Sequence, residues 1–455
     1  MLAARSTPER EKCSKLKGRM ARVNKTWKNL LYATGELWDT VFVHFCMDLE
    51  HVRLICDLAG RTTDPTIVHV STEEAEETDA DNLPGCESMQ DLVAWAMLVG
   101  PLLSPVVAQA KSMRVDCAEP QGLFLLLSAI GTQHALDLQQ LKCYAMVPHS
   151  GNFNYLQPVQ SQQLRQLSIS RINPIGLAPV NNGPNLLHGI TVLRLFYIAN
   201  YMDWDQMIFL LRSCSALEDL DVEGIACNGI LGNVKLTLPH LRSLCMELSD
   251  RGCAQLASIL SLPNIATLTV RGETDAPWRQ LVIDFGEVIR KIRQCCICTF
   301  YYTGAVKDFI GELHSARLID IRTGHGFLTH LTRAAGPGFP SLENLKRWIV
   351  PSDLTYSQAN ILFGWPGSNV DTIYEATKEK DEDSETVRGA ENSIRGIVRR
   401  DKSGEGVVRR QAYTEDSLLN PSERSSYHRD PEMSALDNMA LLGRAYPLNP
   451  SNLAK

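Results

Sequence analysis

Histidine and acidic residues near the N-terminus are the first candidates for chemistry in this 455-residue chain. His44, His51 and His69 share a short stretch with Asp48 and Asp57. Imidazole and carboxylate groups at such spacing can transfer protons or hold a metal ion. A nucleophile motif such as Gly-x-Ser-x-Gly does not accompany them anywhere in the sequence. We therefore expect a protein that is not an enzyme, and we assign no catalytic residue.

A tight group of thiols, Cys295, Cys296 and Cys298, is the second candidate. Structural zinc sites pair two such groups at characteristic Cys and His spacings. His314 and His325, which follow in the sequence, match none of these spacings. The 13 cysteines are odd in number and show no disulfide framework. We expect core thiols in a reducing cytoplasmic or nuclear setting, with no metal and no cofactor.

The elements that would position these residues are repeats. The pattern apolar-x-x-apolar-x-apolar returns about every 24 to 28 residues. Its windows begin at Ala110, Leu138, Leu164, Ile190, Leu217, Leu241, Ile265, Ile292, Ala316 and Leu342. The last two apolar positions of a window alternate, so both point to one face of a short strand. A fixed period with this core is typical of leucine-rich repeats, which stack because no single repeat can bury its apolar face alone.

This periodicity predicts an α/β leucine-rich-repeat solenoid with a parallel sheet and helices on its convex side. Strands are expected near 113–115, 141–143, 167–169, 193–195, 220–222, 244–246 and 268–270. Apolar stripes at helical spacing predict helices within 205–217, 251–262 and 285–292. The alternative is an ordinary α/β protein in which strands and helices alternate without repeating.

Changes in composition along the chain indicate where the predicted domains begin and end. Residues 1–50 are interpreted as a short helical segment, 51–368 as the solenoid and 369–455 as a charged tail whose sparse apolar residues favour disorder. The apolar stretch 92–110 is interrupted by Gly100, Pro101 and Pro105, which predicts a helix, a turn and a second helix, with no membrane span. The formal net charge of −7 argues against nucleic-acid binding by bulk electrostatics.

Two tryptophans mark the N-terminal segment. Trp27, Leu30 and Leu31 stand at helical spacing, and Leu37 and Trp38 follow a turn at Thr34-Gly35. We expect these five apolar residues to form one cluster, because exposed tryptophan rings are costly. The cluster either caps the first repeat or binds a partner protein.

The same segment resembles the last half of an F-box, as found in fungal F-box/leucine-rich-repeat proteins. In that family a helix with Val-x-x-x-Trp precedes Ala-Thr/Ser-x-x-x-Leu-Trp and an extended strand. This chain has Val23…Trp27, Ala33-Thr34…Leu37-Trp38 and Val41-Phe42-Val43. The opening Leu-Pro-x-Glu-Leu/Ile of an F-box has no counterpart in residues 1–22, which are mostly charged.

The resemblance implies a substrate-recognition subunit of a Skp–cullin–F-box ubiquitin ligase. Its repeats would hold a target protein, and its N-terminal helices would hold the ligase adaptor. Such a chain is expected to act as a monomer within a protein complex, in the cytoplasm or nucleus, without nucleic-acid or membrane partners. The alternative is a leucine-rich-repeat scaffold or binding protein with no link to a ubiquitin ligase.

Overall fold

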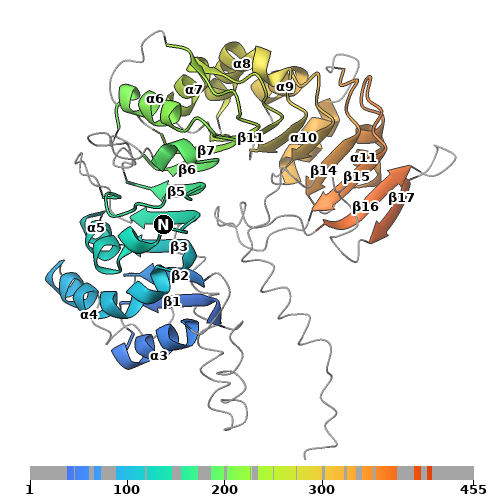
Figure 1. The fold of residues 1–455 in the computed structure, drawn as a ribbon. Coiled ribbons are helices and arrows are strands. Elements are labelled where there is room, and N and C mark those ends of the chain that lie inside the picture. Colours follow the sequence, from blue (N-terminus) through green and yellow to red (C-terminus); the bar gives the residue numbers. More distant parts are fainter. Residues whose placement is uncertain are drawn as a thin grey trace, which may run out of the picture.

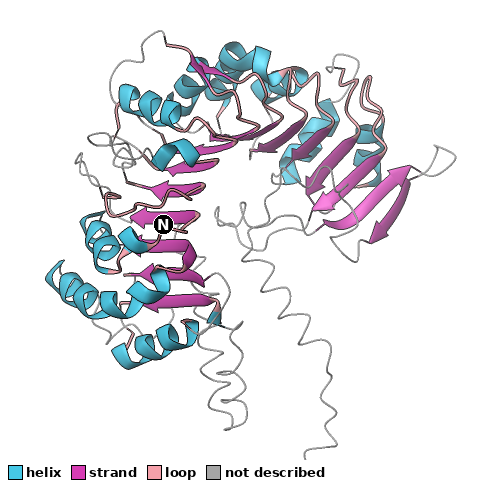
Figure 2. Cartoon of the chain, in the orientation of Figure 1, coloured by secondary structure: helices cyan, strands magenta, loops and turns pink. Residues whose placement is uncertain are grey.

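One 15-stranded sheet runs through the computed structural model, and helices cover its outer side (Figures 1 and 2). The structure describes residues 38–45, 47–60, 66–72, 89–117, 120–145, 155–172, 186–198, 202–225, 227, 234–248, 251–272, 274–299, 303–321, 325–334, 341–351, 355–376, 394–400 and 407–411. The strands lie along the inside of an arc, so the predicted leucine-rich-repeat-type α/β solenoid is confirmed.

The strands follow one another across the sheet almost in chain order. Their bounds are β1 (Thr40–His44), β2 (Thr66–Ser71), β3 (Ala110–Cys117), β4 (Gln140–Ala145), β5 (Gln166–Ser170), β6 (Val192–Phe196), β7 (Asp219–Glu223), β9 (Ser243–Glu247), β11 (Thr267–Arg271), β12 (Gln294–Cys298), β13 (Leu318–Ile321), β14 (Arg347–Pro351), β15 (Thr372–Ala376), β16 (Ile394–Arg400) and β17 (Val407–Gln411). Pairing is parallel from β1 to β15 and antiparallel from β15 to β17. A separate pair joins β8 (Leu236–Thr237) to β10 (Leu260–Ser261).

The register of the strands explains the sequence period. Each window places its second and third apolar residues in the core, and the same positions of adjacent strands are partners. One such column contains Val41, Val68, Met113, Leu141, Leu167, Leu193, Leu220, Leu244, Leu268, Cys295, Ile319, Trp348 and Ile373, all buried. The predicted strands from 113 to 270 therefore lie where the pattern placed them. The last window is the exception, because Trp348 and Val350, and not Leu345 and Arg347, are its strand core positions.

Helices return the chain across the outer side of the sheet. They are α3 (Leu49–Ala59), α4 (Met89–Val107), α5 (Pro120–Ala129), α6 (Trp204–Ser213), α7 (Arg251–Ile259), α8 (Asp275–Ile289), α9 (Gly304–Gly311), α10 (His325–Ala334) and α11 (Tyr356–Phe363). Capping boxes begin two of them: the Asp203 carboxylate accepts the Gln206 N–H at 2.7 Å before α6, and Thr355 pairs with Gln358 before α11. The helices expected near 205–217, 251–262 and 285–292 correspond to α6, α7 and the end of α8.

The stretch predicted as helix, turn and helix is one continuous helix, α4. Pro101 and Pro105 lie inside it, and both are exposed, so water can bond the carbonyls that lack an N–H partner. Among the described helices, α4 alone has the length and apolar composition to cross a membrane. Within the solenoid it packs between α3 and α5, and 44% of that apolar stretch is buried.

The sheet extends across both predicted domain borders, at residues 50 and 368. Residues 40–44 form β1, so the described part of the 1–50 segment already belongs to the solenoid. At the other end, β15, β16 and β17 lie beyond residue 368, where a disordered tail was expected. An antiparallel edge pair can form through backbone hydrogen bonds without the apolar periodicity of a repeat, which is why composition did not reveal it. Residues 412–455 lie outside the described part of the chain.

Candidate functional site: the concave face of the sheet

The concave face is built from the strand residues that alternate with the core positions. One residue of each strand stands at the middle of this face, and the register aligns these residues in a column. From β2 to β13 they are His69, Arg114, Lys142, Ser168, Arg194, Asp221, Cys245, Thr269, Cys296 and Asp320. Four of the five column residues from β2 to β6 are His, Arg or Lys, whereas the five from β7 to β13 are two Asp, two Cys and one Thr.

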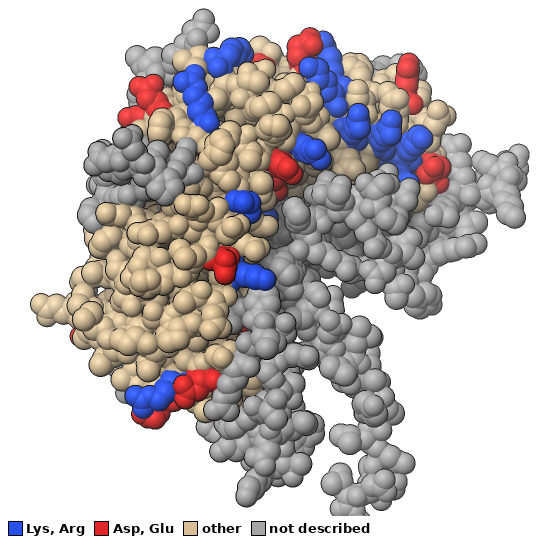
Figure 3. Space-filling view, viewed as in Figure 1, with Lys and Arg blue, Asp and Glu red and all other residues tan. Residues whose placement is uncertain are grey.

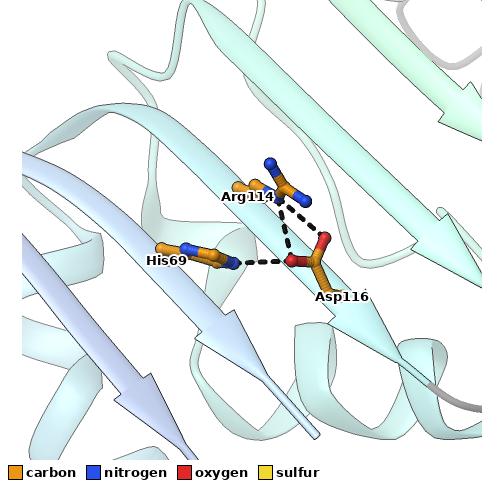
Figure 4. A network of polar contacts seen from close by, with 3 residues as sticks. All are labelled: His69, Arg114 and Asp116. Atoms are coloured by element: carbon orange, nitrogen blue, oxygen red, sulfur yellow. Dashed lines mark hydrogen bonds and ion pairs between the residues drawn. The ribbon is translucent and has the colours of Figure 1, made fainter. Parts of the chain in front are cut away.

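A buried polar network joins the first strands of this face (Figure 4). His69 Nε2 on β2 lies 2.7 Å from Asp116 Oδ2 on β3. Arg114 Nε, also on β3, donates to both oxygens of Asp116, at 2.8 and 2.9 Å. The side chains of His69 and Asp116 are 0% and 2% exposed, so these charges interact in a medium far less polar than water.

The electrostatics of the network favour an ionised Asp116. Burial by itself would raise the pKa of this carboxyl, but the charges and hydrogen bonds of Arg114 and His69 outweigh it and lower the pKa below its ordinary value. Aromatic rings enclose the group: Phe42 meets the His69 ring edge to face, with centroids 4.9 Å apart, and Arg114 lies 4.7 Å above the Tyr144 ring.

Asp116 is the centre of this arrangement. All three contacts of Asp116 hold neighbouring side chains in place, as a positioning carboxylate does. Their effect is to set the Arg114 guanidinium above Tyr144 on the concave face. Arg and Tyr are enriched among the residues that dominate binding energy in protein interfaces.

A second network continues along the strand ends from β5 to β11. Arg171 lies 5.6 Å over the Tyr197 ring, and the Tyr197 hydroxyl donates to Glu223 Oε1 at 2.5 Å. Glu223 Oε2 in turn accepts from Arg271 Nη1 at 3.0 Å. Four repeats thus contribute to one chain of charged and aromatic contacts.

Backbone strain accompanies this second network. Arg171 and Tyr197 have φ values of 59° and 53°, in the left-handed region that side chains other than glycine avoid. The equivalent position after β7 is Gly224, with φ 60°. A Cβ there would lie 2.7 Å from Tyr197 Cδ1, so glycine leaves room for the ring. Strained residues of this kind concentrate at functional sites.

Arg271 is the cation at the β11 end of the second network, and its side chain is 18% exposed. Burial opposes its charge, but Cys245, Asp221, Cys298 and Glu223 outweigh burial and raise its pKa. The guanidinium therefore stays charged at any physiological pH.

The cysteine group divides between the two faces of β12. Cys295 lies in the core, where burial raises its pKa and keeps the thiol protonated. Cys296 and Cys298 face the concave side with their sulfurs 3.7 Å apart. No group of three His, Cys, Asp or Glu side chains suited to a metal ion occurs among the described residues.

The structure describes one of the five residues predicted for adaptor binding or capping. Trp38 stands three residues before Val41, which makes it the first apolar position of the first repeat, and it is 9% exposed within the solenoid core. Trp27, Leu30, Leu31 and Leu37 lie outside the described residues.

His69 contacts a carboxylate, and that carboxylate, Asp116, stands 47 residues away in the sequence. His44 ends β1, and His51 is exposed on α3. Arg114, Asp116 and Glu223 are charged residues that stand next to the apolar positions of their repeats. The sequence shows them as candidates for a polar face, but it does not show which residues they contact, because that depends on the strand register.

Comparisons with known proteins give one similarity of fold at low sequence identity. No protein-family model matches the sequence, and no curated protein is significantly similar to it. Among solved structures, it is similar to the crystal structure of the Rad7 and Elc1 complex in yeast, at 14% identity and a TM-score of 0.33. The match covers 76% of this chain and 90% of the other. A similarity of this size does not indicate what the chain does.

Proposed function

We propose that this protein is a binding subunit that holds a protein partner on the concave face of its solenoid. The observation that carries the proposal is the unbroken parallel sheet from β1 to β15, which presents one aligned row of side chains per repeat. Extended concave sheets of this kind serve solenoids as surfaces for large ligands. The Arg171–Tyr197 contact, which is partly exposed, supplies side chains that such interfaces favour.

The finer part of the proposal is a role as substrate-recognition subunit of a Skp–cullin–F-box ubiquitin ligase. It is supported by the sequence of the N-terminal segment, Val23…Trp27 and Ala33-Thr34…Leu37-Trp38. Activity in the cytoplasm or nucleus is part of the same proposal. The ten cysteines of the described residues are thiols and not disulfides, as reducing compartments favour.

Burial of Trp38 changes the experiment that tests the ligase role. Because Trp38 is a core residue of the first repeat, its replacement would disturb the solenoid whether or not an adaptor binds. The informative variant is Trp27→Ala, measured on the full-length chain by co-elution with a purified Skp-type adaptor and the N-terminal domain of a cullin.

Arg194→Glu is the matched control, since Arg194 lies at the middle of the concave face on β6. Co-elution of the wild type and of Arg194→Glu, with loss in Trp27→Ala, would support the ligase role. A wild-type chain that never binds the adaptor would leave the alternative, a leucine-rich-repeat scaffold with no ubiquitin-ligase link.

A further inference from the structure

A row of exposed basic side chains follows the edge of the sheet at which the strands begin. The residues that directly precede β9, β12, β13 and β14 are Arg242, Arg293, Arg317 and Lys346, and all four side chains are exposed. We name these four residues the basic row. Lys and Arg gather in the space-filling view over the part of the arc that holds β12 to β14 (Figure 3).

Backbone hydrogen bonds hold the row in register. Arg293 N donates to the Ala266 carbonyl at 2.9 Å, Arg317 N to the Arg293 carbonyl at 2.8 Å and Lys346 N to the Arg317 carbonyl at 3.0 Å. The side chains are therefore presented at strand spacing, about 4.8 Å from one repeat to the next. Such an array is set by the fold and does not have to be assembled when a ligand arrives.

The charges of the row are not neutralised by the described residues. Arg290, which is not part of the row, forms ion pairs with Glu287 and Glu312. Arg242, Arg293, Arg317 and Lys346 make no ion pair with another residue that the structure describes. Cations held along one edge repel one another, so an anionic ligand would lower the free energy of this edge.

A cavity opens where the row is interrupted. Ala266 precedes β11, and its short side chain leaves a hollow between Arg242 and Arg293. The hollow has a volume of about 630 Å³, and Lys291 and His240 also contribute to its walls. Three cations, two of them arginines that can bind a carboxylate through two parallel hydrogen bonds, therefore surround one open space.

We propose that the basic row and its cavity bind an acidic segment of a partner polypeptide in extended form. The row is one side chain wide, which matches a single extended strand better than a duplex. Glu218, the residue before β7, and Asp371, the residue before β15, border the row on both sides and would repel a longer polyanion. The net charge of −7 likewise gives no broad basic field for nucleic acid. This surface is separate from the concave face, so the proposal does not depend on the ligase role.

The test is fluorescence anisotropy of a labelled octaglutamate peptide titrated with the purified full-length chain. An octaglutamine peptide measures binding without charge, and a nine-nucleotide thymidine single strand measures nucleic-acid binding at the same number of charges. Arg293→Glu/Arg317→Glu is the test variant. Its dissociation constant for octaglutamate should rise at least about tenfold, because reversal turns two attractions into repulsions.

Lys111→Glu/Arg333→Glu is the matched control. Both residues are exposed, one preceding the core of β3 and the other on α10, and the double variant changes net charge by the same amount. Retained octaglutamate binding in this control, together with its loss in the test variant, would support the proposal. Equal loss in both variants, no binding by the wild type, or tighter binding of the thymidine strand than of octaglutamate would overturn it. Circular dichroism of each variant confirms that the fold is intact.

Discussion

The Asp116→Asn variant is expected to unfold at a clearly lower urea concentration than the wild type. Asp116 accepts hydrogen bonds from His69 and Arg114 at 2.7 to 2.9 Å, and the three side chains are between 0% and 10% exposed. A single charge-assisted hydrogen bond contributes about 1.5–3 kcal/mol. The three bonds share one carboxylate and asparagine keeps one acceptor, so their energies do not add. Loss of one member of a buried ion pair costs about 3–5 kcal/mol, which is the expected decrease in unfolding free energy.

The effect has a predictable dependence on pH. The pKa of Asp116 is lowered in the folded protein, so its contribution is complete above the unfolded pKa of about 3.9 and is lost as pH falls through the lower folded pKa. The stability difference between the wild type and Asp116→Asn should therefore shrink as the pH falls below about 4. Tryptophan fluorescence in urea, measured across this range, checks both the size and the pH window.

Two outcomes would refute the reasoning. One is an unfolding midpoint of Asp116→Asn equal to that of the wild type at pH 7, and the other is a difference that stays unchanged below pH 3. Arg114→Met/Asp116→Leu serves as the companion variant, since it removes both charges. It should be less destabilised than Asp116→Asn, because no uncompensated buried cation remains on β3.

The remaining predictions concern packing. Leu220→Ala and Leu244→Ala should each lower the unfolding free energy by about 2–5 kcal/mol, because both side chains are fully buried and leave a cavity; an unchanged urea midpoint would contradict the strand register. Trp38→Ala should cost about 3–5 kcal/mol and reduce hydrogen-exchange protection of β1, whereas wild-type stability would show that Trp38 does not support the first repeat. Gly224→Ala should cost about 1–3 kcal/mol, from its positive φ and from the contact of the new Cβ with Tyr197. Adding Tyr197→Ala should recover part of that loss in thermal unfolding, and no recovery would assign the whole cost to the backbone.

The apolar residues of this chain were sufficient to predict the repeat architecture. A strand core position such as Leu220 or Leu244 is recognisable because its neighbours in the next repeat carry the same kind of side chain at the same phase. That signal is local and repeated, so one error, as at the window of Leu342, shifts a single strand and not the fold. Trp38, Val41 and Val43 form one more window of the same pattern, and all three are buried. This window was not recognised because Trp38 was interpreted as part of the N-terminal motif.

The contacts between the polar residues that stand next to the apolar positions were decided only by the tertiary structure. His69 and Asp116 are 47 residues apart, and Glu223 and Arg271 are 48 apart, yet each pair is in hydrogen-bond contact. The loops between strands vary in length, so spacing along the chain does not show which side chains share a row. Hydrogen bonds between adjacent strands set that register, and a shift of one residue would turn each of these side chains toward the opposite face. The pattern of apolar residues therefore determined the solenoid, whereas strand register decided the polar surface that it presents.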